Sequence, residues 1–212
     1  MRKEESIITK NRKTRSDKKK DVKPTVSVNL KRCIERLSFI TGIPIKDVVE
    51  IICEKGLRSK SVIDHLSEHF RRDFQYRNTL YLGDLEKESL QRKRQSGRTE
   101  RITTRFTQLT YENICTLAYA LDVTPTKATG ILLDASVHNT NILNAFVKSY
   151  LHTQLDQNRM KELKQILKFI NQNNPYQEEI SWFALVSKIF DDIKASTHNV
   201  KIAINHWMDK QK

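Results

Sequence analysis

Two short segments of the chain carry polar side chains at every second position. The six residues are Thr25, Ser27 and Asn29 in the first segment and Arg101, Thr103 and Arg105 in the second. An arginine can donate to both O6 and N7 of guanine, an asparagine can pair with adenine, and a threonine can meet a polar base edge or a thymine methyl. Such a set could read a base sequence. The alternative is that these are ordinary solvent-facing residues of an edge strand.

The residues between these polar positions predict a short β-strand in each segment. They are Val26, Val28 and Leu30 in the first segment and Ile102 and Phe106 in the second. A period of two places polar and apolar side chains on opposite faces of a strand. We therefore expect strands near residues 25–30 and 101–106. A strand this short needs a partner edge, which either the other segment or a second copy of the chain could provide.

Each strand is followed by the pattern of two amphipathic helices joined by a tight turn. Gly42 suits the left-handed end of the first helix. Thr124 and Pro125 predict a helix start, as an N-cap hydroxyl and a proline at the first position. Moving the first unit along by 80 residues aligns the helices, with Ile34 on Ile114. The strands align at a shift of 76, as though the second unit had four additional residues between strand and helix.

This order of elements resembles the ribbon-helix-helix family of DNA-binding proteins. The units read TVSVNLKRCIERLSFITGIPIKDVVEIICEKGL and RITTRFTQLTYENICTLAYALDVTPTKATGILLDASV. The second unit is similar to the branch of the family found in plasmid mobilisation accessory proteins. The spacing of that branch is matched by Arg105, Thr107, Tyr111 and Ile114. The resemblance implies an antiparallel ribbon that enters the major groove of DNA, with the six alternating polar residues as the base contacts.

The resemblance also implies where DNA phosphates are held. In this family the start of the second helix of each unit grips the DNA backbone, through free amides and the positive end of the helix dipole. The matching residues are Lys46 in the first unit and Thr124, Thr126 and Lys127 in the second. Pro44 stands where the family usually has a capping side chain, so the first contact rests on Lys46.

The charge of the chain favours a nucleic-acid partner. The formal net charge is +13 at pH 7, and the pI is about 9.7. Residues 1–23 hold ten Lys or Arg against four acidic residues, without apolar periodicity. This is typical of a flexible basic arm that contacts phosphates, here through Lys18, Lys19 and Lys20, or of a solubilising tail. We expect no secretory signal, no membrane partner and a cytoplasmic location, because no sufficiently long apolar run is present.

One motif indicates a different class of function. Residues 65–69, HLSEH, match the H-x-x-E-H signature of zinc peptidases, in which both histidines would bind zinc and Glu68 would act as the base. No strong third ligand stands near them, so a surface helix with two histidines is the preferred interpretation. The three cysteines form no C-x-x-C pair and indicate neither a zinc site nor a disulfide. We therefore expect no catalysis, no cofactor and no metal.

The predicted fold is mainly α with short β. It contains two ribbon-helix-helix-like units, which could form a single-chain pseudo-dimer, and a C-terminal helical bundle suited to homo-oligomerisation or to docking a partner protein. Further helices are expected over residues 61–77, 142–154, 160–170, 179–194 and 200–208. The expected domains are an arm (1–23), unit one (24–58), a helical and polar connector (59–100), unit two (101–140) and the bundle (141–212).

The predicted function is sequence-specific binding of double-stranded DNA. Transcriptional regulation, as a repressor, is the first expected role. An accessory role at a plasmid or phage locus, in origin processing or partition, is the alternative. A binder of RNA or anionic surfaces that relies on the basic arm alone would show no preferred sequence, whereas a ribbon that reads bases must show one.

Overall fold

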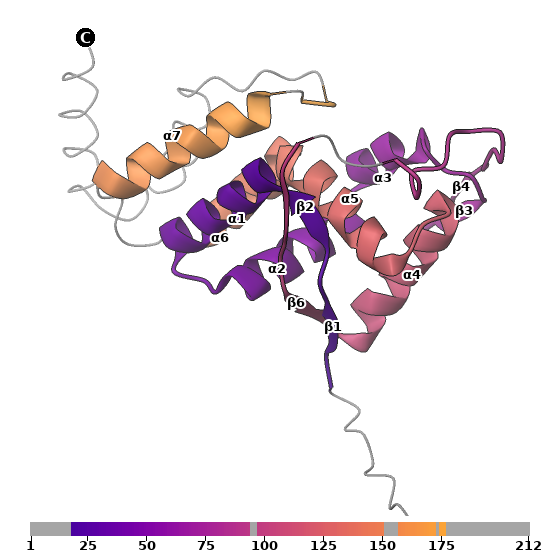
Figure 1. Ribbon diagram of the computed structural model, residues 1–212, viewed down its shortest axis with the longest axis horizontal. Coiled ribbons are helices and arrows are strands. Elements are labelled where there is room, and N and C mark those ends of the chain that lie inside the picture. The colour runs from indigo at the N-terminus through magenta and orange to yellow at the C-terminus, as the bar shows by residue number, and fades with distance from the viewer. Residues whose placement is uncertain (1–17, 94–96, 151–156, 173, 177–212) are drawn as a thin grey trace, which may run out of the picture.

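The computed structural model describes residues 18–93, 97–150, 157–172 and 174–176. Within these ranges the chain is mainly helical with short antiparallel strands, as expected (Figure 1). The helices are α1 (Val28–Thr41), α2 (Ile45–Arg58), α3 (Lys60–Ser67), α4 (Gln108–Leu121), α5 (Pro125–His138), α6 (Thr140–Tyr150) and α7 (Gln157–Asn171). The strands are β1 (Lys20–Val22), β2 (Thr25–Ser27), β3 (Phe74–Tyr76), β4 (Thr79–Tyr81), β5 (Thr99–Arg101) and β6 (Thr104–Phe106).

Four strands form one antiparallel ribbon from two distant parts of the same chain. β1 pairs with β6 and β2 pairs with β5, and in both sheets the paired residue numbers add up to 126, as for Lys20 and Phe106. Between the two sheets the Ile102 amide donates to the Pro24 carbonyl at 3.1 Å, so the register continues past the proline. We call these two segments, residues 20–27 and 99–106, the ribbon.

The first helix after each side of the ribbon begins at a hydroxyl cap and ends at a left-handed residue. Ser27 accepts a hydrogen bond from the Leu30 amide at 3.1 Å, and Thr107 caps α4 in the same way. Gly42 has a φ of 71° and Asp122 a φ of 55°, a conformation that Gly adopts freely and Asp tolerates. The buried residues of α1 recur at helical spacing and are Leu30, Cys33, Ile34, Leu37 and Ile40.

The two strand–helix–helix units match at a single shift of 80 residues. α4 starts at 108 against 28 for α1, and α5 starts at 125 against 45 for α2. The caps Ser27 and Thr107 obey the same shift, so the expected shift of 76 for the strands is wrong. The expected strand 25–30 is also too long, because Ser27 caps α1 and thereby places Val28 and Leu30 in the helix.

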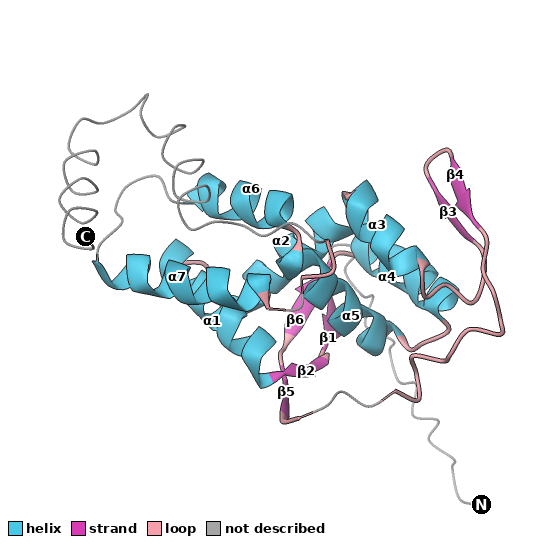
Figure 2. Ribbon diagram, turned by 90° about the horizontal axis from the view of Figure 1, so that it is seen from above, coloured by secondary structure: helices cyan, strands magenta, loops and turns pink. Residues whose placement is uncertain are grey.

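This shift reveals a pseudo-twofold axis through the molecule. Lys23 is equivalent to Thr103, and the two face each other in the register of the ribbon. A residue that faces its own equivalent marks a twofold axis. Further along this axis α2 meets α5 at Gly56 and Ser136, which are also 80 residues apart and therefore equivalent. A Cβ on Gly56 would lie 2.0 Å from the Ser136 hydroxyl. Figure 2 shows the ribbon between α1 on one side and α4 on the other.

The connector departs from its expected structure. The helix expected over residues 61–77 ends at Ser67, and β3 and β4 instead form a hairpin. Aromatic residues that favour strands flank a two-residue Arg77–Asn78 turn there, and Arg77 has a φ of 52°. The zinc-peptidase interpretation required residues 65–69 to lie on one helix. They do not, because α3 stops at Ser67.

Two helices follow the second unit, and α6 packs against both α2 and α5. α7 packs along α1, and Arg36 Nε lies 2.8 Å from Glu162 Oε2 across that contact. The expected helices 142–154 and 160–170 correspond to α6 and α7, although residues 151–154 lie outside the described ranges. The expected helices 179–194 and 200–208 lie wholly outside them. No helix of the described ranges is both long and apolar enough to cross a lipid bilayer.

Candidate nucleic-acid interface

The ribbon presents one polar face to solvent. On this face three cross-strand pairs have both residues exposed, namely Asp21–Arg105, Lys23–Thr103 and Thr25–Arg101. The pseudo-twofold axis passes through the middle pair. Four of the six predicted base-contacting residues therefore lie together on this face, namely Thr25, Arg101, Thr103 and Arg105. We call the six paired residues the outer face.

The opposite face of the ribbon is buried against the helices. Its apolar residues Val22, Val26, Ile102 and Phe106 are at most 4% exposed. Thr104 is also fully buried, and its hydroxyl donates to the Lys46 carbonyl at 2.9 Å, which satisfies the polar group. Since alternate residues of a strand point to opposite sides, burial of this face determines which residues form the outer face.

An ion pair crosses the outer face at one end. Arg105 Nε donates to Asp21 Oδ1 at 2.6 Å, and the two side chains are 58% and 56% exposed. An exposed pair of this kind contributes little to the stability of the fold, on the order of 0–1 kcal/mol. The pair instead holds the Arg105 guanidinium against Asp21 through its Nε–H.

Ser27 and Asn29 do not belong to the three exposed pairs. The Ser27 hydroxyl is engaged in capping α1, and Asn29 is exposed in the first turn of that helix. Ser27 is the last residue of β2 and pairs with Thr99, as a strand position requires. The expected place of Asn29 on the strand is wrong, because the strand ends where α1 begins.

The start of α2 is exposed beside the ribbon. Pro44 provides no side-chain cap, and Ile45 and Lys46 are exposed. The Thr104 hydrogen bond to the Lys46 carbonyl ties this helix start to β6. Exposed amides at the positive end of a helix, next to a lysine, suit a phosphate oxygen. The expected phosphate contact at Lys46 is thus in an accessible position.

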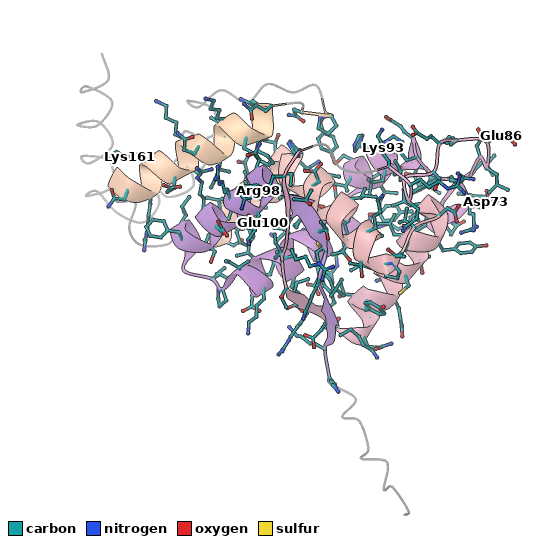
Figure 3. All side chains as sticks on the ribbon, in the orientation of Figure 1. Asp73, Glu86, Lys93, Arg98, Glu100 and Lys161 are labelled. Carbon is teal, nitrogen blue, oxygen red and sulfur yellow. The ribbon has the colours of Figure 1, made fainter. Side chains whose placement is uncertain are left out.

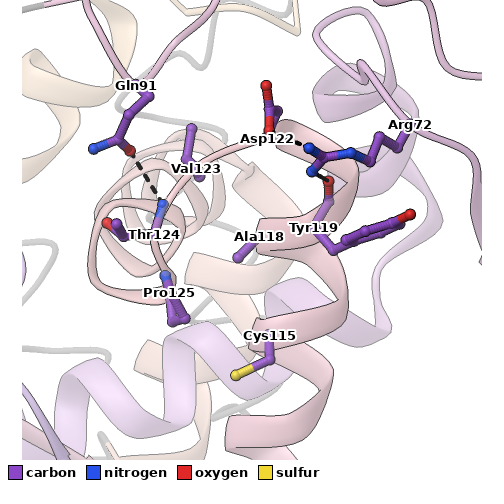
Figure 4. A pocket seen from close by; sticks show the side chains of 9 residues that line it. All are labelled: Arg72, Gln91, Cys115, Ala118, Tyr119, Asp122, Val123, Thr124 and Pro125. Carbon is purple, nitrogen blue, oxygen red and sulfur yellow. Dashed lines mark hydrogen bonds and ion pairs between the residues drawn. The ribbon is translucent and has the colours of Figure 1, made fainter.

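The start of α5 is covered by the connector. The Thr124 amide donates to Gln91 Oε1 at 3.1 Å (Figure 4), and the Thr124 hydroxyl accepts from the Lys127 amide at 3.3 Å. Lys127 Nζ donates to the carbonyls of Gln91 at 2.9 Å and Lys93 at 2.8 Å. Burial lowers the pKa of Lys127. Thr126 remains exposed. The two helix starts, equivalent in the repeat, therefore differ in the hydrogen bonds that the connector makes to the start of α5.

A pocket of about 420 Å³ adjoins the covered start of α5. Figure 4 shows the side chains that line it, including Cys115, Tyr119 and Asp122. Its charges neutralise each other, because Arg72 Nη2 lies 2.7 Å from Asp122 Oδ1. The lining carries no pairing of a nucleophile with a base that would indicate catalysis.

The three lysines expected to contact phosphates differ in their surroundings. Lys18 and Lys20 are exposed, and Lys20 belongs to β1. Lys19 instead places its ammonium 2.6 Å from the carboxylate of Glu50, whose side chain is only 10% exposed. Residues 1–17 of the expected arm lie outside the described ranges.

A second ion pair holds the other end of the ribbon to α1. Lys31 Nζ donates to Glu100 Oε2 at 2.8 Å, and Arg98 lies nearby, as the labelled side chains in Figure 3 show. The hydrogen bond from Lys31 lowers the pKa of Glu100, and the same bond raises the pKa of Lys31. Glu100 is thus compensated by α1 and does not oppose the positive charge of the outer face.

Sequence reasoning missed two residues of the outer face, Asp21 and Lys23. Both lie in the expected arm, because the expected strand begins at Thr25, five residues after the ribbon segment begins at Lys20. The shift of 80 already seen in the helices contained the signal, since it makes Asp21 equivalent to Arg101 and Lys23 equivalent to Thr103.

The described residues contain no group of three or more His, Cys, Asp or Glu side chains placed to hold a metal ion. Comparison with known proteins gave no match to a protein-family model, to a curated protein or to a solved structure.

Proposed function

We propose that this protein binds double-stranded DNA sequence-specifically and inserts its ribbon into the major groove. The observation that carries the proposal is the continuous ribbon formed within one chain, with an apolar face on the helices and a polar outer face in solvent. The major groove of B-DNA is about 12 Å wide and admits a two-stranded β-ribbon. Both units would then form a single-chain version of the ribbon-helix-helix arrangement that the sequence resembles.

Charge supports the proposal. Lys23, Arg101 and Arg105 outweigh Asp21 on the outer face, and the formal net charge of the chain is +13. The accessible start of α2 lies beside the ribbon and provides Lys46 for a phosphate. Phosphate contacts of this kind position a protein on the duplex, and contacts to base edges make it specific. The base contacts we propose are Asp21, Lys23, Thr25, Arg101, Thr103 and Arg105.

The first biological role that we propose is transcriptional repression. An accessory role at a plasmid or phage locus needs the same DNA-binding surface. The spacing of Arg105, Thr107, Tyr111 and Ile114, which is similar to that of mobilisation accessory proteins, favours it as the second candidate. The position of the preferred site, at a promoter or at a transfer or replication origin, distinguishes the two roles.

Selection from a pool of random duplexes, followed by titration of variants, tests the function. We expect one enriched sequence. Arg105→Ala should weaken binding to it by about 1–3 kcal/mol, the value of a good bidentate base contact, and should change binding to a scrambled duplex much less. Lys46→Ala is the matched control, and it should weaken both duplexes by a similar factor. Absence of an enriched sequence would leave only a non-specific RNA or anionic-surface binder.

A further inference from the structure

The two ends of the outer face differ although the pseudo-twofold axis relates them. The shift of 80 makes Asp21 equivalent to Arg101 and Thr25 equivalent to Arg105. Each end therefore holds one arginine, and both arginines belong to the same segment of the ribbon, residues 99–106. The residue opposite the arginine is an aspartate at one end and a threonine at the other.

Asp21 constrains Arg105 through the part of the guanidinium that a guanine contact does not need. The contact joins Arg105 Nε to Asp21 Oδ1 at 2.6 Å. It leaves the four N–H bonds of the two Nη groups for other acceptors, and a bidentate contact with guanine O6 and N7 requires two of them. Among the described residues Arg101 forms no ion pair.

We propose, resting on the proposed function, that Asp21 is a positioning and specificity residue. It holds Arg105 ready for a guanine and makes this end of the ribbon the more selective one. Because the equivalent end lacks the carboxylate, the protein binds an asymmetric site in one orientation.

Two physical effects produce this selectivity. An arginine that is already held loses less side-chain freedom when it binds a base, so the correct contact is strengthened. The remaining lone pairs of the Asp21 carboxylate can accept from a cytosine amino group, but they repel the acceptor edges of other bases and the phosphates. The carboxylate thereby weakens binding to every sequence that does not present the right donor. A ribbon without Asp21 would bind more DNA sequences, although the two arginines would still occupy positions that the pseudo-twofold axis does not relate.

The test measures base preference at each position of the selected site. Duplexes with one altered base pair each are titrated with the wild type and with Arg105→Ala, Asp21→Ala, Asp21→Asn and Thr25→Ala. The positions at which Arg105→Ala loses its preference define the Arg105 end. We expect Asp21→Ala to lower the preference there by about tenfold, to leave the other end unchanged, and to bind a scrambled duplex more tightly. Asp21→Asn, which keeps an acceptor oxygen for Arg105 Nε, should retain part of the preference.

Thr25→Ala is the matched control: because Thr25 stands opposite Arg101, it should lower the base preference at the Arg101 end and leave the preference at the Arg105 end intact. In the Arg105→Ala background, Asp21→Ala should change the preference no further. If Asp21→Ala strengthens all duplexes by one factor and leaves every preference intact, Asp21 is only a repelling charge and the inference fails alone. A wild type with no preferred duplex overturns both the inference and the proposed function.

Discussion

Gly56 and Ser136 are in contact where α2 meets α5, and a Cβ on Gly56 would lie 2.0 Å from the Ser136 hydroxyl oxygen. That hydroxyl is buried and donates to the Leu132 carbonyl at 2.6 Å, so it cannot move aside freely. We expect Gly56→Ala to lower the free energy of unfolding by about 1–3 kcal/mol through overpacking, despite the better helix propensity of alanine. Chemical denaturation measures this change.

A double variant, Gly56→Ala with Ser136→Gly, is the control for this contact. Ser136→Gly in the Gly56→Ala background moves the larger residue to the other helix and removes the clash, so it should recover most of the lost stability. If the double variant is as unstable as the sum of the two single variants, the contact at the pseudo-twofold axis is not the cause.

The dependence of DNA affinity on salt should reveal the phosphate contacts. If 4–8 phosphates are neutralised, the logarithm of the affinity should fall with the logarithm of the salt concentration at a slope of about −4 to −7. Deletion of residues 1–17, which hold six Lys or Arg, should flatten this slope and weaken all duplexes alike. The deletion stops before Lys18 because β1 belongs to the ribbon.

A variant of full length in which the six basic residues of 1–17 are replaced by glutamine separates charge from chain length. It should behave like the deletion. A slope and an affinity that neither change affects would mean that the arm makes no phosphate contact.

Lys46 and Lys127 should respond differently to substitution. Lys127 donates to two carbonyls of the connector, so we expect Lys127→Met to speed amide hydrogen exchange around Gln91 and to reduce stability by about 1 kcal/mol. Lys46→Met should leave exchange unchanged and weaken DNA binding at all sequences. An effect of Lys127→Met on DNA affinity without any change in exchange would show that its ammonium contacts phosphate directly.

The pH dependence of stability should include a contribution from His65. Burial lowers the pKa of His65 below its usual 6.5. The negative charges of Glu68 and Asp134 raise this pKa but do not outweigh burial, and the positive charges of His69 and His138 lower it further. The folded state therefore disfavours the protonated ring. The stabilisation is fully present above pH 6.5 and is lost as the pH falls through 6.5 towards the folded pKa.

Denaturation of the wild type and of His65→Gln between pH 7.5 and pH 5.5 isolates this contribution from that of the other histidines. The wild type should lose more stability than the variant on acidification. Parallel curves would show that His65 titrates alike in the folded and unfolded chain.

The helices of both units could be predicted because their signals are local. Gly42 ends α1, Thr124 and Pro125 start α5, and the apolar positions recur at helical spacing. The strand boundary could not be read in the same way. Val26, Val28 and Leu30 alternate as in a strand, yet the Ser27 cap diverts the chain into α1 after residue 27. Alternation over five residues does not distinguish a strand that continues from one that runs into a helix.

The hairpin of β3 and β4 was missed for a related reason. Phe70 and Phe74 are four residues apart, which suggests a helix, but Phe74 lies in β3 opposite Tyr81. The pairing across the turn outweighs the helical spacing, because the strand residues gain a partner on the neighbouring strand.

The sequence by itself determined the mainly helical composition, the repeat of two units and the basic character of the chain, because periodicity, caps and charge depend on neighbouring residues or on simple counts. Only the tertiary structure decided the register of the ribbon and the pairing within one chain. These depend on contacts between distant residues, such as Arg105 and Asp21, 84 positions apart. Burial of Val22, Ile102 and Phe106 against both helix pairs selects that register, and no local pattern contains the information.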